Sequence, residues 1–267
     1  MKKLVCVLLC FLIYNLANAQ EVIFTKKLKT ISEKKALVVL NGFGASKKRI
    51  QIQKEFFKNL GYDVFIPKYV NKNSLDLTVK SFSSFYYENS LDKYHEVKFL
   101  CYIIGGYVLN QHIEKNGRDN ITSIIYDRSP TQERAPKVAT EKFPFISKIL
   151  YGKILAEFSN ESITSLSNSS GLKIGVIIEN KATRLMRFFK KESDTYGEYN
   201  YNAIEIEKNL DDCIHTYLDH DLMYERFDVI GAEILFFLAK GKFSKNARRE
   251  KYNWDPFKKI KTNDIDL

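Results

Sequence analysis

The stretch FLCYIIGGYVLN, from Phe99 to Asn110, decides how this chain folds. An apolar run of the length of a strand meets the pair Gly105 and Gly106, and the following residues have the spacing of a helix up to about 114. Glycines at the start of a helix let its backbone approach the preceding strand closely. The stretch therefore predicts a buried strand, a sharp turn and a helix packed against the sheet.

The same alternation of short apolar runs and longer amphipathic segments continues along the chain. Strands are expected at 36–41, 63–67, 97–103, 121–127, 172–179 and 213–221, and helices at 49–60, 75–87, 105–114 and 228–238. The strands are near-continuous apolar runs, as in parallel sheets that are buried on both faces. We predict an α/β fold, a mostly parallel sheet covered by helices on both faces, with 97–103 central between 36–41 and 121–127.

One segment interrupts this alternation. Residues 128–136 have the proline and polar content of a loop, and 137–170 then form an insertion with a helix expected at 145–158 and a Ser/Asn-rich end. An insertion between two strands of a sheet is where a small helical lid would lie. We therefore expect a lid over the end of the sheet.

The N-terminus has the features of a secretory signal peptide. Lys2 and Lys3 precede an apolar run from Leu4 to Leu16, and the small residues of Ala17-Asn18-Ala19 favour cleavage before Gln20. We predict an exported protein, periplasmic or secreted. Its parts would be a signal peptide at 1–19, one α/β domain at 20–240 and a basic C-terminal tail at 241–267, with no later apolar run long enough to span a bilayer.

The charge and the cysteines limit the partners and the chemistry. The net charge of +10 falls to about +8 when the two signal lysines are removed, and much of it lies in the tail, which either contacts an anionic surface or is simply solvated. We expect no specific nucleic-acid binding, and a monomer. Cys101 and Cys213 remain in the mature chain and fall on strands that are not neighbours, which predicts two free thiols. With neither metal-ligand spacing nor a Gly-rich phosphate loop in the sequence, we expect no metal and no cofactor.

Four stretches, in this order, resemble the α/β-hydrolase fold family of esterases and lipases, with reduced N-terminal strands. They are VVLNGFGAS (38–46), FLCYIIGGYVLN (99–110), VIIENKATRLM (176–186) and LDHDLMYERFDVIGAEILFFL (218–238). The resemblance covers about 36–240. It implies an oxyanion-type loop at Asn41, Gly42, Phe43 and Gly44, and a nucleophile elbow at Tyr102, Ile103, Ile104, Gly105 and Gly106.

At the elbow, the nucleophile's position is held by Ile103. A sec-butyl side chain cannot attack a carbonyl carbon, and a shift of register offers only Tyr102 or Ile104. Gly105 and Gly106 keep the packing role. The resemblance therefore implies a hydrolase-like fold without its usual nucleophile.

The other catalytic positions are partly kept. His220 matches the family's terminal histidine, and the acid is either Asp127, after the strand that follows the elbow strand, or Glu179 on the next one. Asp127 could instead belong to a local turn with Arg128. Ser129 and Ser46 follow strand ends at the same edge and are candidates for a displaced nucleophile.

Three functions remain open at this stage. The first is a non-catalytic hydrolase-like protein, a pseudoenzyme, that binds a small apolar or acyl ligand or a partner through the former pocket, which Ile103, Phe43, Phe145 and Ile149 would line. The second is an active esterase with a displaced nucleophile, or a His–Asp proton-transfer site at His220 and Asp127. The third is a surface-associated protein that acts through its basic tail.

Overall fold

The computed structural model describes residues 21–24 and 30–259, so the predicted signal peptide lies outside the described residues. Seven strands form one sheet: β1 (Glu21–Ile23), β2 (Lys35–Leu40), β3 (Asp63–Ile66), β4 (Glu96–Tyr102), β5 (Ile121–Arg128), β6 (Lys173–Lys181) and β7 (Asp212–Asp219). Their order in the sheet is β1-β3-β2-β4-β5-β6-β7. Only β1 pairs antiparallel, with β3, and the other neighbours run parallel. The predicted α/β fold with a central β4 is confirmed.

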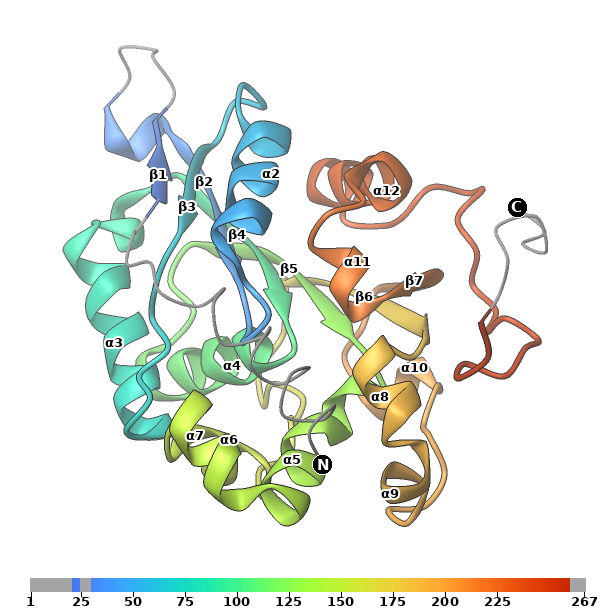
Figure 1. Cartoon of the computed structure of the whole chain (residues 1–267). Helices are drawn as coiled ribbons and strands as arrows, with labels where there is room; N and C mark the ends of the chain where they lie inside the picture. The colour runs from blue at the N-terminus through green and yellow to red at the C-terminus, as the bar shows by residue number, and fades with distance from the viewer. Residues whose placement is uncertain (1–20, 25–29, 260–267) are drawn as a thin grey trace.

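Helices cover both faces of the sheet, as predicted (Figure 1). The longer ones are α2 (Lys47–Phe57), α3 (Leu75–Glu88), α4 (Ile104–Asn116) and α12 (Phe227–Lys240). Alternate residues of β2 face opposite sides of the sheet. Val38 and Leu40 pack in the core that α3 and α4 cover, and Leu37 and Val39 pack in the core that α2 and α12 cover. No helix in the described ranges combines the length and the hydropathy needed to cross a bilayer.

The lid segment contains three helices instead of the single helix predicted at 145–158. They are α5 (Ala135–Lys142), α6 (Pro144–Tyr151) and α7 (Ile154–Phe158), and α5 begins inside the segment predicted as a loop. The break between α6 and α7 falls at Gly152, which has φ +76° and whose added Cβ would lie 2.1 Å from the carbonyl oxygen of Lys72. Only glycine fits at this position, because any side chain would collide with the loop before α3. The positive φ of Gly152 ends α6.

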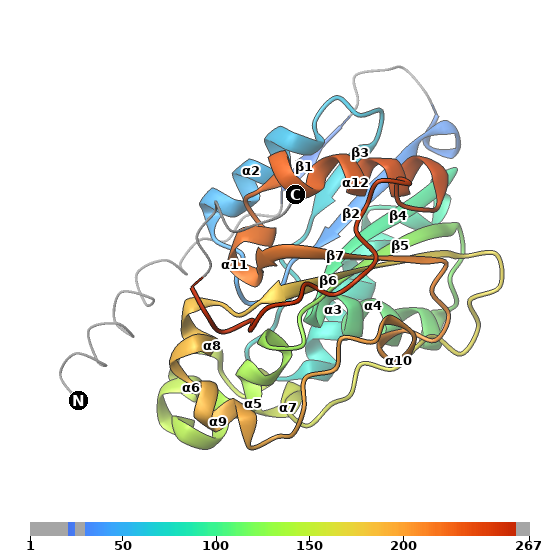
Figure 2. The same cartoon turned by 90° about the vertical axis from the view of Figure 1, so that its right-hand side faces the viewer.

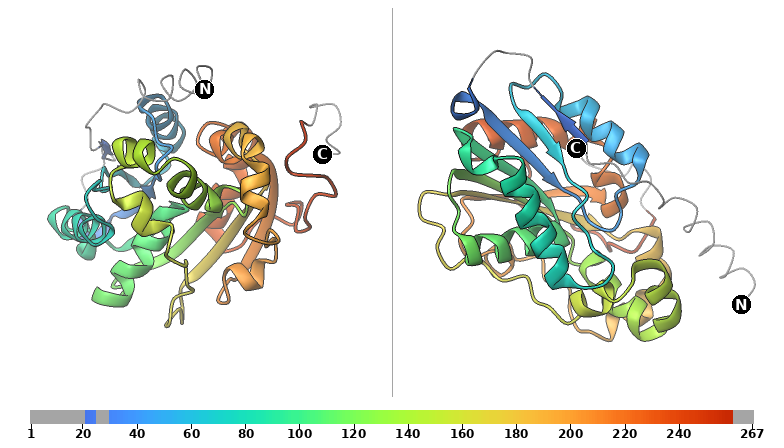
Figure 3. Two further views of the ribbon diagram at one scale, coloured as in Figure 1. Left: turned by 60° about the horizontal axis from the view of Figure 1, so that its bottom comes forward. Right: turned by 90° about the vertical axis from the view of Figure 1, so that its left-hand side faces the viewer.

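Short helices complete the edge of the sheet to which the parallel strands point. They are α8 (Arg184–Phe188), α9 (Lys190–Asp194), α10 (Ala203–Ile206) and α11 (His220–Met223). Figures 2 and 3 show α5 to α7 and α8 to α9 gathered at one end of the molecule, away from α12.

The chain after α12 returns along the sheet (Figure 2). The backbone N–H of His215 in β7 donates to the carbonyl oxygen of Arg248 at 2.8 Å, and the Trp254 indole N–H donates to the carbonyl oxygen of Asn180 at 3.0 Å. Up to residue 259, the basic tail is therefore held on β6 and β7. Cys101 lies on β4 and Cys213 on β7, and β5 and β6 lie between these two strands. Both thiols are free, as predicted.

Candidate functional site

The site lies where β4, β5, β6 and β7 end. Because the carboxyl ends of parallel strands share one edge, the residues there come together despite their separation in sequence. Ile103 follows β4, Asp127 lies near the end of β5, Glu179 lies near the end of β6, and His220 follows β7. The structure thus brings the predicted elbow, both candidate acids and the histidine to one place.

Glu179 is the acid that holds His220. His220 Nδ1 lies 2.7 Å from Glu179 Oε1 and 3.6 Å from Asp127 Oδ2, so the Nδ1–H donates to Glu179 and Asp127 is the second neighbour. All three side chains are buried. The alternative acid of the sequence analysis is therefore the closer partner, and the two carboxylates surround one ring nitrogen.

The two carboxylates determine the protonation of this cluster. Both oxygens of Asp127 and Oε2 of Glu179 are buried without a hydrogen-bond partner among the described residues. Burial and the Asp127 charge raise the pKa of Glu179 well above its ordinary value. Burial lowers the pKa of His220, but Glu179, Tyr224 and Asp127 together outweigh it and raise that pKa well above 6.5. Both shifts favour keeping a proton between Glu179 Oε1 and His220 Nδ1, which lie 2.7 Å apart.

The cluster also has the composition of a metal site. Asp127, Glu179 and His220 offer ligand atoms that all lie within 4.8 Å of one another, a grouping that the sequence spacing does not reveal. A metal bound through His220 Nδ1 or Glu179 Oε1 would have to break the 2.7 Å contact between these two atoms. A contact of this length is the usual hydrogen bond between a carboxylate and a histidine. The geometry therefore favours a proton, and not a metal, between Glu179 and His220.

Sequence reasoning missed Tyr224, which occupies the centre of the site. Its hydroxyl lies 3.3 Å from His220 Nε2, and it accepts the backbone N–H of Gly42 at 3.3 Å. The ring stacks on Tyr102 at 4.1 Å between centroids and is fully buried. The signal for it was its place four residues after His220, because i and i+4 side chains meet on one helical face.

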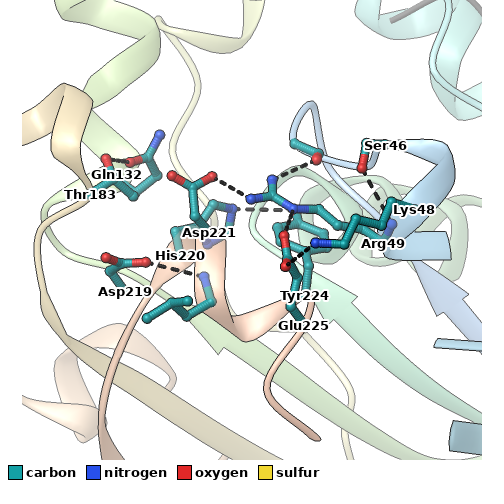
Figure 4. Close-up of polar contacts among 12 residues, drawn as sticks. Ser46, Lys48, Arg49, Gln132, Thr183, Asp219, His220, Asp221, Tyr224 and Glu225 are labelled. Carbon is teal, nitrogen blue, oxygen red and sulfur yellow. Dashed lines mark hydrogen bonds and ion pairs between the residues drawn. The ribbon is translucent and has the colours of Figure 1, made fainter. Parts of the chain in front are cut away.

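Arg49 of α2 holds Tyr224 from the other side. Its guanidinium lies 5.3 Å from the centroid of the Tyr224 ring and donates to Asp221 and Glu225, each at 2.9 Å (Figure 4). The same group donates to the carbonyl oxygen of Gly44 at 2.8 Å. Arg49 therefore joins α2, the oxyanion-type loop and the segment that carries His220.

The oxyanion-type loop is engaged inside the protein. The side-chain amides of Asn41 and Gln53 form two hydrogen bonds with each other, at 2.7 and 2.8 Å. The backbone carbonyl oxygen of Asn41 accepts a hydrogen bond from the Tyr69 hydroxyl at 2.5 Å. Phe43 packs against Tyr151 and Phe158, with ring centroids 5.5 and 6.4 Å away. The loop is thus fixed by its own neighbours, and its Gly42 N–H binds Tyr224.

The elbow has the predicted packing but an apolar centre. Ile103 lies at the junction of β4 and α4 with φ 13° and ψ −84°, is 8 % exposed, and packs in the core with Ile104. A Cβ on Gly105 would lie 2.3 Å from the carbonyl oxygen of Leu40, and one on Gly106 would lie 3.0 Å from Tyr126. Both glycines therefore let α4 approach its neighbours closely, in the packing role predicted for them.

The two serines proposed as displaced nucleophiles have other partners. Ser129 is buried, and its Oγ accepts the Gln132 N–H at 3.4 Å. Ser46 is the N-cap of α2 and accepts the Arg49 N–H at 3.3 Å. His220 Nε2 is paired with the hydroxyl of Tyr224, so the structure does not bring either serine to the histidine as a hydrogen-bonded pair.

Two more predicted contacts differ from the structure. Arg128 pairs with Glu133, with Nε and Oε1 2.6 Å apart, and not with Asp127, because Asp127 and Arg128 are successive residues of β5 and their side chains point to opposite faces of the sheet. Phe145 and Ile149, predicted to line an apolar pocket, are 74 % and 59 % exposed. The break at Gly152 directs Tyr151 and Phe158 toward Phe43 in their place.

Comparison with known proteins establishes the fold. No protein-family model and no curated protein matches the sequence. Among solved structures, an α/β-hydrolase fold protein from Chitinophaga pinensis aligns with a TM-score of 0.53 at 14% identity, over 83% of this chain and 97% of that one. Est1E from Butyrivibrio proteoclasticus gives a TM-score of 0.52 at 11% identity, over 84% and 99%. A bromoperoxidase from Bacillus anthracis gives 0.50 at 12% identity, over 83% and 95%. The chain has the α/β-hydrolase fold.

Proposed function

We propose that this protein is an exported, non-catalytic protein of the α/β-hydrolase fold, which binds a ligand or a partner at its former active site. One observation carries the proposal. The Tyr224 hydroxyl lies 3.3 Å from both the Gly42 N–H and His220 Nε2, the two groups that a hydrolase would turn toward its substrate and its nucleophile.

Hydrolysis by an acyl-enzyme route needs three functions that are all compromised here. The nucleophile's position holds Ile103, whose side chain has no atom that can attack a carbonyl. The nitrogen that would take the nucleophile's proton, His220 Nε2, already contacts the Tyr224 hydroxyl at 3.3 Å. The Gly42 N–H, the oxyanion-type donor, is already bound to Tyr224. The cluster is then a structural polar network.

The binding function is placed at the mouth of this site. Phe43 of the oxyanion-type loop and Tyr151 of α6 are both partly exposed, and their ring centroids lie 5.5 Å apart. Apolar surfaces with a few polar groups beneath them suit small apolar or acyl ligands. Export is supported by the signal-like residues 1–19, and N-terminal sequencing of the secreted or periplasmic chain should return Gln20 as the first residue.

Two measurements test the proposal. The purified protein should hydrolyse short acyl esters of p-nitrophenol no faster than its His220→Ala variant. Ile103→Ser should restore little rate, because the new hydroxyl lacks a free base. A clear activity that depends on His220 would overturn the non-catalytic assignment. A fluorescent fatty-acid probe should bind to the unaltered protein. Ile103→Trp should reduce that binding, and circular dichroism should show that this variant still folds.

A second function is favoured by the continuity of the polar relay. The Tyr224 hydroxyl, His220 and Glu179 form an unbroken series of contacts at 3.3 and 2.7 Å, as a hydroxyl, a base and an acid would in an enzyme. In that case the protein would be a hydrolase or proton-transfer enzyme, and Tyr224→Phe and His220→Ala would abolish turnover alike. A serine-directed phosphonate that labelled Ser129 or Ser46 would assign the displaced nucleophile.

A further inference from the structure

Two helices near the carboxyl edge of the sheet expose large apolar side chains. Phe145 and Ile149 of α6 are 74 % and 59 % exposed, and Phe188 and Leu185 of α8 are 66 % and 39 % exposed. We call these four residues the apolar rim. Exposed side chains of this size are common singly, but a group of them on adjoining helices marks an interaction surface.

The two halves of the apolar rim are joined by aromatic contacts. Phe143, at the start of α6, packs against Phe189, at the end of α8, with ring centroids 5.3 Å apart. Phe189 in turn contacts Phe188 at 4.8 Å. Figure 2 shows α6 and α8 at the same end of the molecule. The helices α6 and α8 are therefore joined through Phe143 and Phe189, which brings the exposed apolar side chains of both to the same end of the molecule.

The segments that carry the apolar rim are basic. Residues 135–158, which form α5 to α7, contain four lysines and two glutamates, and residues 181–194 contain five lysines or arginines and two acids, so both segments carry a net positive charge. Lys142, Lys148, Arg184 and Lys191 are exposed. The neighbouring Lys190 is paired with Asp194, with Nζ and Oδ2 2.6 Å apart. Exposed aromatic and aliphatic side chains among unbalanced positive charges are the composition of segments that lie in the headgroup region of a membrane.

We propose that the apolar rim and its surrounding cations dock on the surface of an anionic lipid bilayer. Phe145, Ile149 and Phe188 would enter the headgroup boundary, while the lysines and arginines would bind the lipid phosphates with their stems along the apolar surface. The carboxyl edge of the sheet, which carries His220, then faces the membrane, since α6 and α8 belong to the connections that leave β5 and β6 at that edge. This inference holds whether or not the site retains catalysis.

The rim is a better lipid surface than the basic tail. Two tail cations lie over aromatic rings of the protein itself. Arg248 is 4.2 Å from the centroid of the Tyr252 ring, and Lys251 is 4.2 Å from the centroid of the Tyr201 ring. The exposed tail cations near α12, such as Lys242 and Lys245, are accompanied by the buried Phe243, and no comparable group of exposed apolar side chains adjoins them among residues 240–259.

Vesicle flotation of the mature chain tests the proposal. The protein should float with vesicles of phosphatidylcholine and phosphatidylglycerol and not with phosphatidylcholine alone, and high salt should weaken this binding. The double variant Phe145→Ser/Phe188→Ser should bind about tenfold more weakly or worse. Lys142→Gln/Lys148→Gln/Lys191→Gln should lose binding to anionic vesicles and leave the melting temperature unchanged, since these side chains are exposed.

Two control variants make the test specific. Phe236→Ser removes a 39 % exposed phenylalanine from α12, away from the rim, and should bind as the unaltered protein does. Lys240→Gln/Lys242→Gln/Lys245→Gln removes the exposed last lysine of α12 and two exposed tail cations, and should also leave binding unchanged. The proposal is overturned if the protein fails to float with anionic vesicles, if only the tail variant loses binding, or if a soluble polyanion such as heparin or RNA binds in preference to vesicles.

Discussion

Replacing Tyr224 by phenylalanine isolates the oxygen atom on which the proposed function depends. The ring should keep its stack on Tyr102 at 4.1 Å and its contact with Arg49, while the Gly42 N–H and His220 Nε2 lose their common partner. A lost neutral hydrogen bond costs about 1 kcal/mol, and a bond to a charged group costs about 1.5–3 kcal/mol. We therefore expect Tyr224→Phe to lower the free energy of unfolding by about 3 kcal/mol.

Tyr102→Phe is the matched control, because Tyr102 is the other member of the stack and is equally buried. Its hydroxyl donates to the carbonyl oxygen of Met223 at 3.2 Å, so its loss should cost about 1 kcal/mol. Urea denaturation followed by circular dichroism measures both, with the midpoint shifting and the slope unchanged. If Tyr224→Phe destabilises the protein no more than Tyr102→Phe does, the phenol oxygen is not the partner of the site, and the structural-network interpretation is wrong.

Three further outcomes are expected. Gly105→Ala would place its Cβ 2.3 Å from the carbonyl oxygen of Leu40 and should lower the free energy of unfolding by about 3 kcal/mol, measured by urea denaturation; a loss below about 1 kcal/mol would show that α4 can move away from β2. The folded-state pKa of His220 is raised above 6.5, so the folded state binds its proton more tightly; this contribution to stability is complete below about pH 6.5 and is lost as the pH rises through the folded pKa. The melting temperature should therefore fall toward alkaline pH more steeply than in His220→Ala, and equal slopes would contradict the raised pKa. Thiol titration of the unfolded, unreduced mature chain should return both Cys101 and Cys213, and a result of zero would require a disulfide that the strand order forbids.

The sequence by itself determined the fold and the packing of the turn between β4 and α4. Apolar runs of strand length separated by amphipathic segments require a buried parallel sheet, because such strands cannot have one face in water. The pair Gly105 and Gly106 predicted the close approach of α4, which the structure confirms, and Ile103 beside them is the basis for the proposal that the usual acyl nucleophile is missing. These features are local, so a short window of sequence contains all of their causes.

Tertiary structure alone decided how the site is completed. Asp127 and Glu179 were both possible acids, and the choice of Glu179 depends on a difference of 0.9 Å between 2.7 and 3.6 Å, which register and side-chain direction set across neighbouring strands. Tyr224 carries no motif, and only the turn of α11 directs its hydroxyl to Gly42, 182 residues earlier. The apolar rim likewise joins helices from two separate connections. Contacts between residues distant in sequence depend on the packing of the whole chain, and no local pattern encodes them.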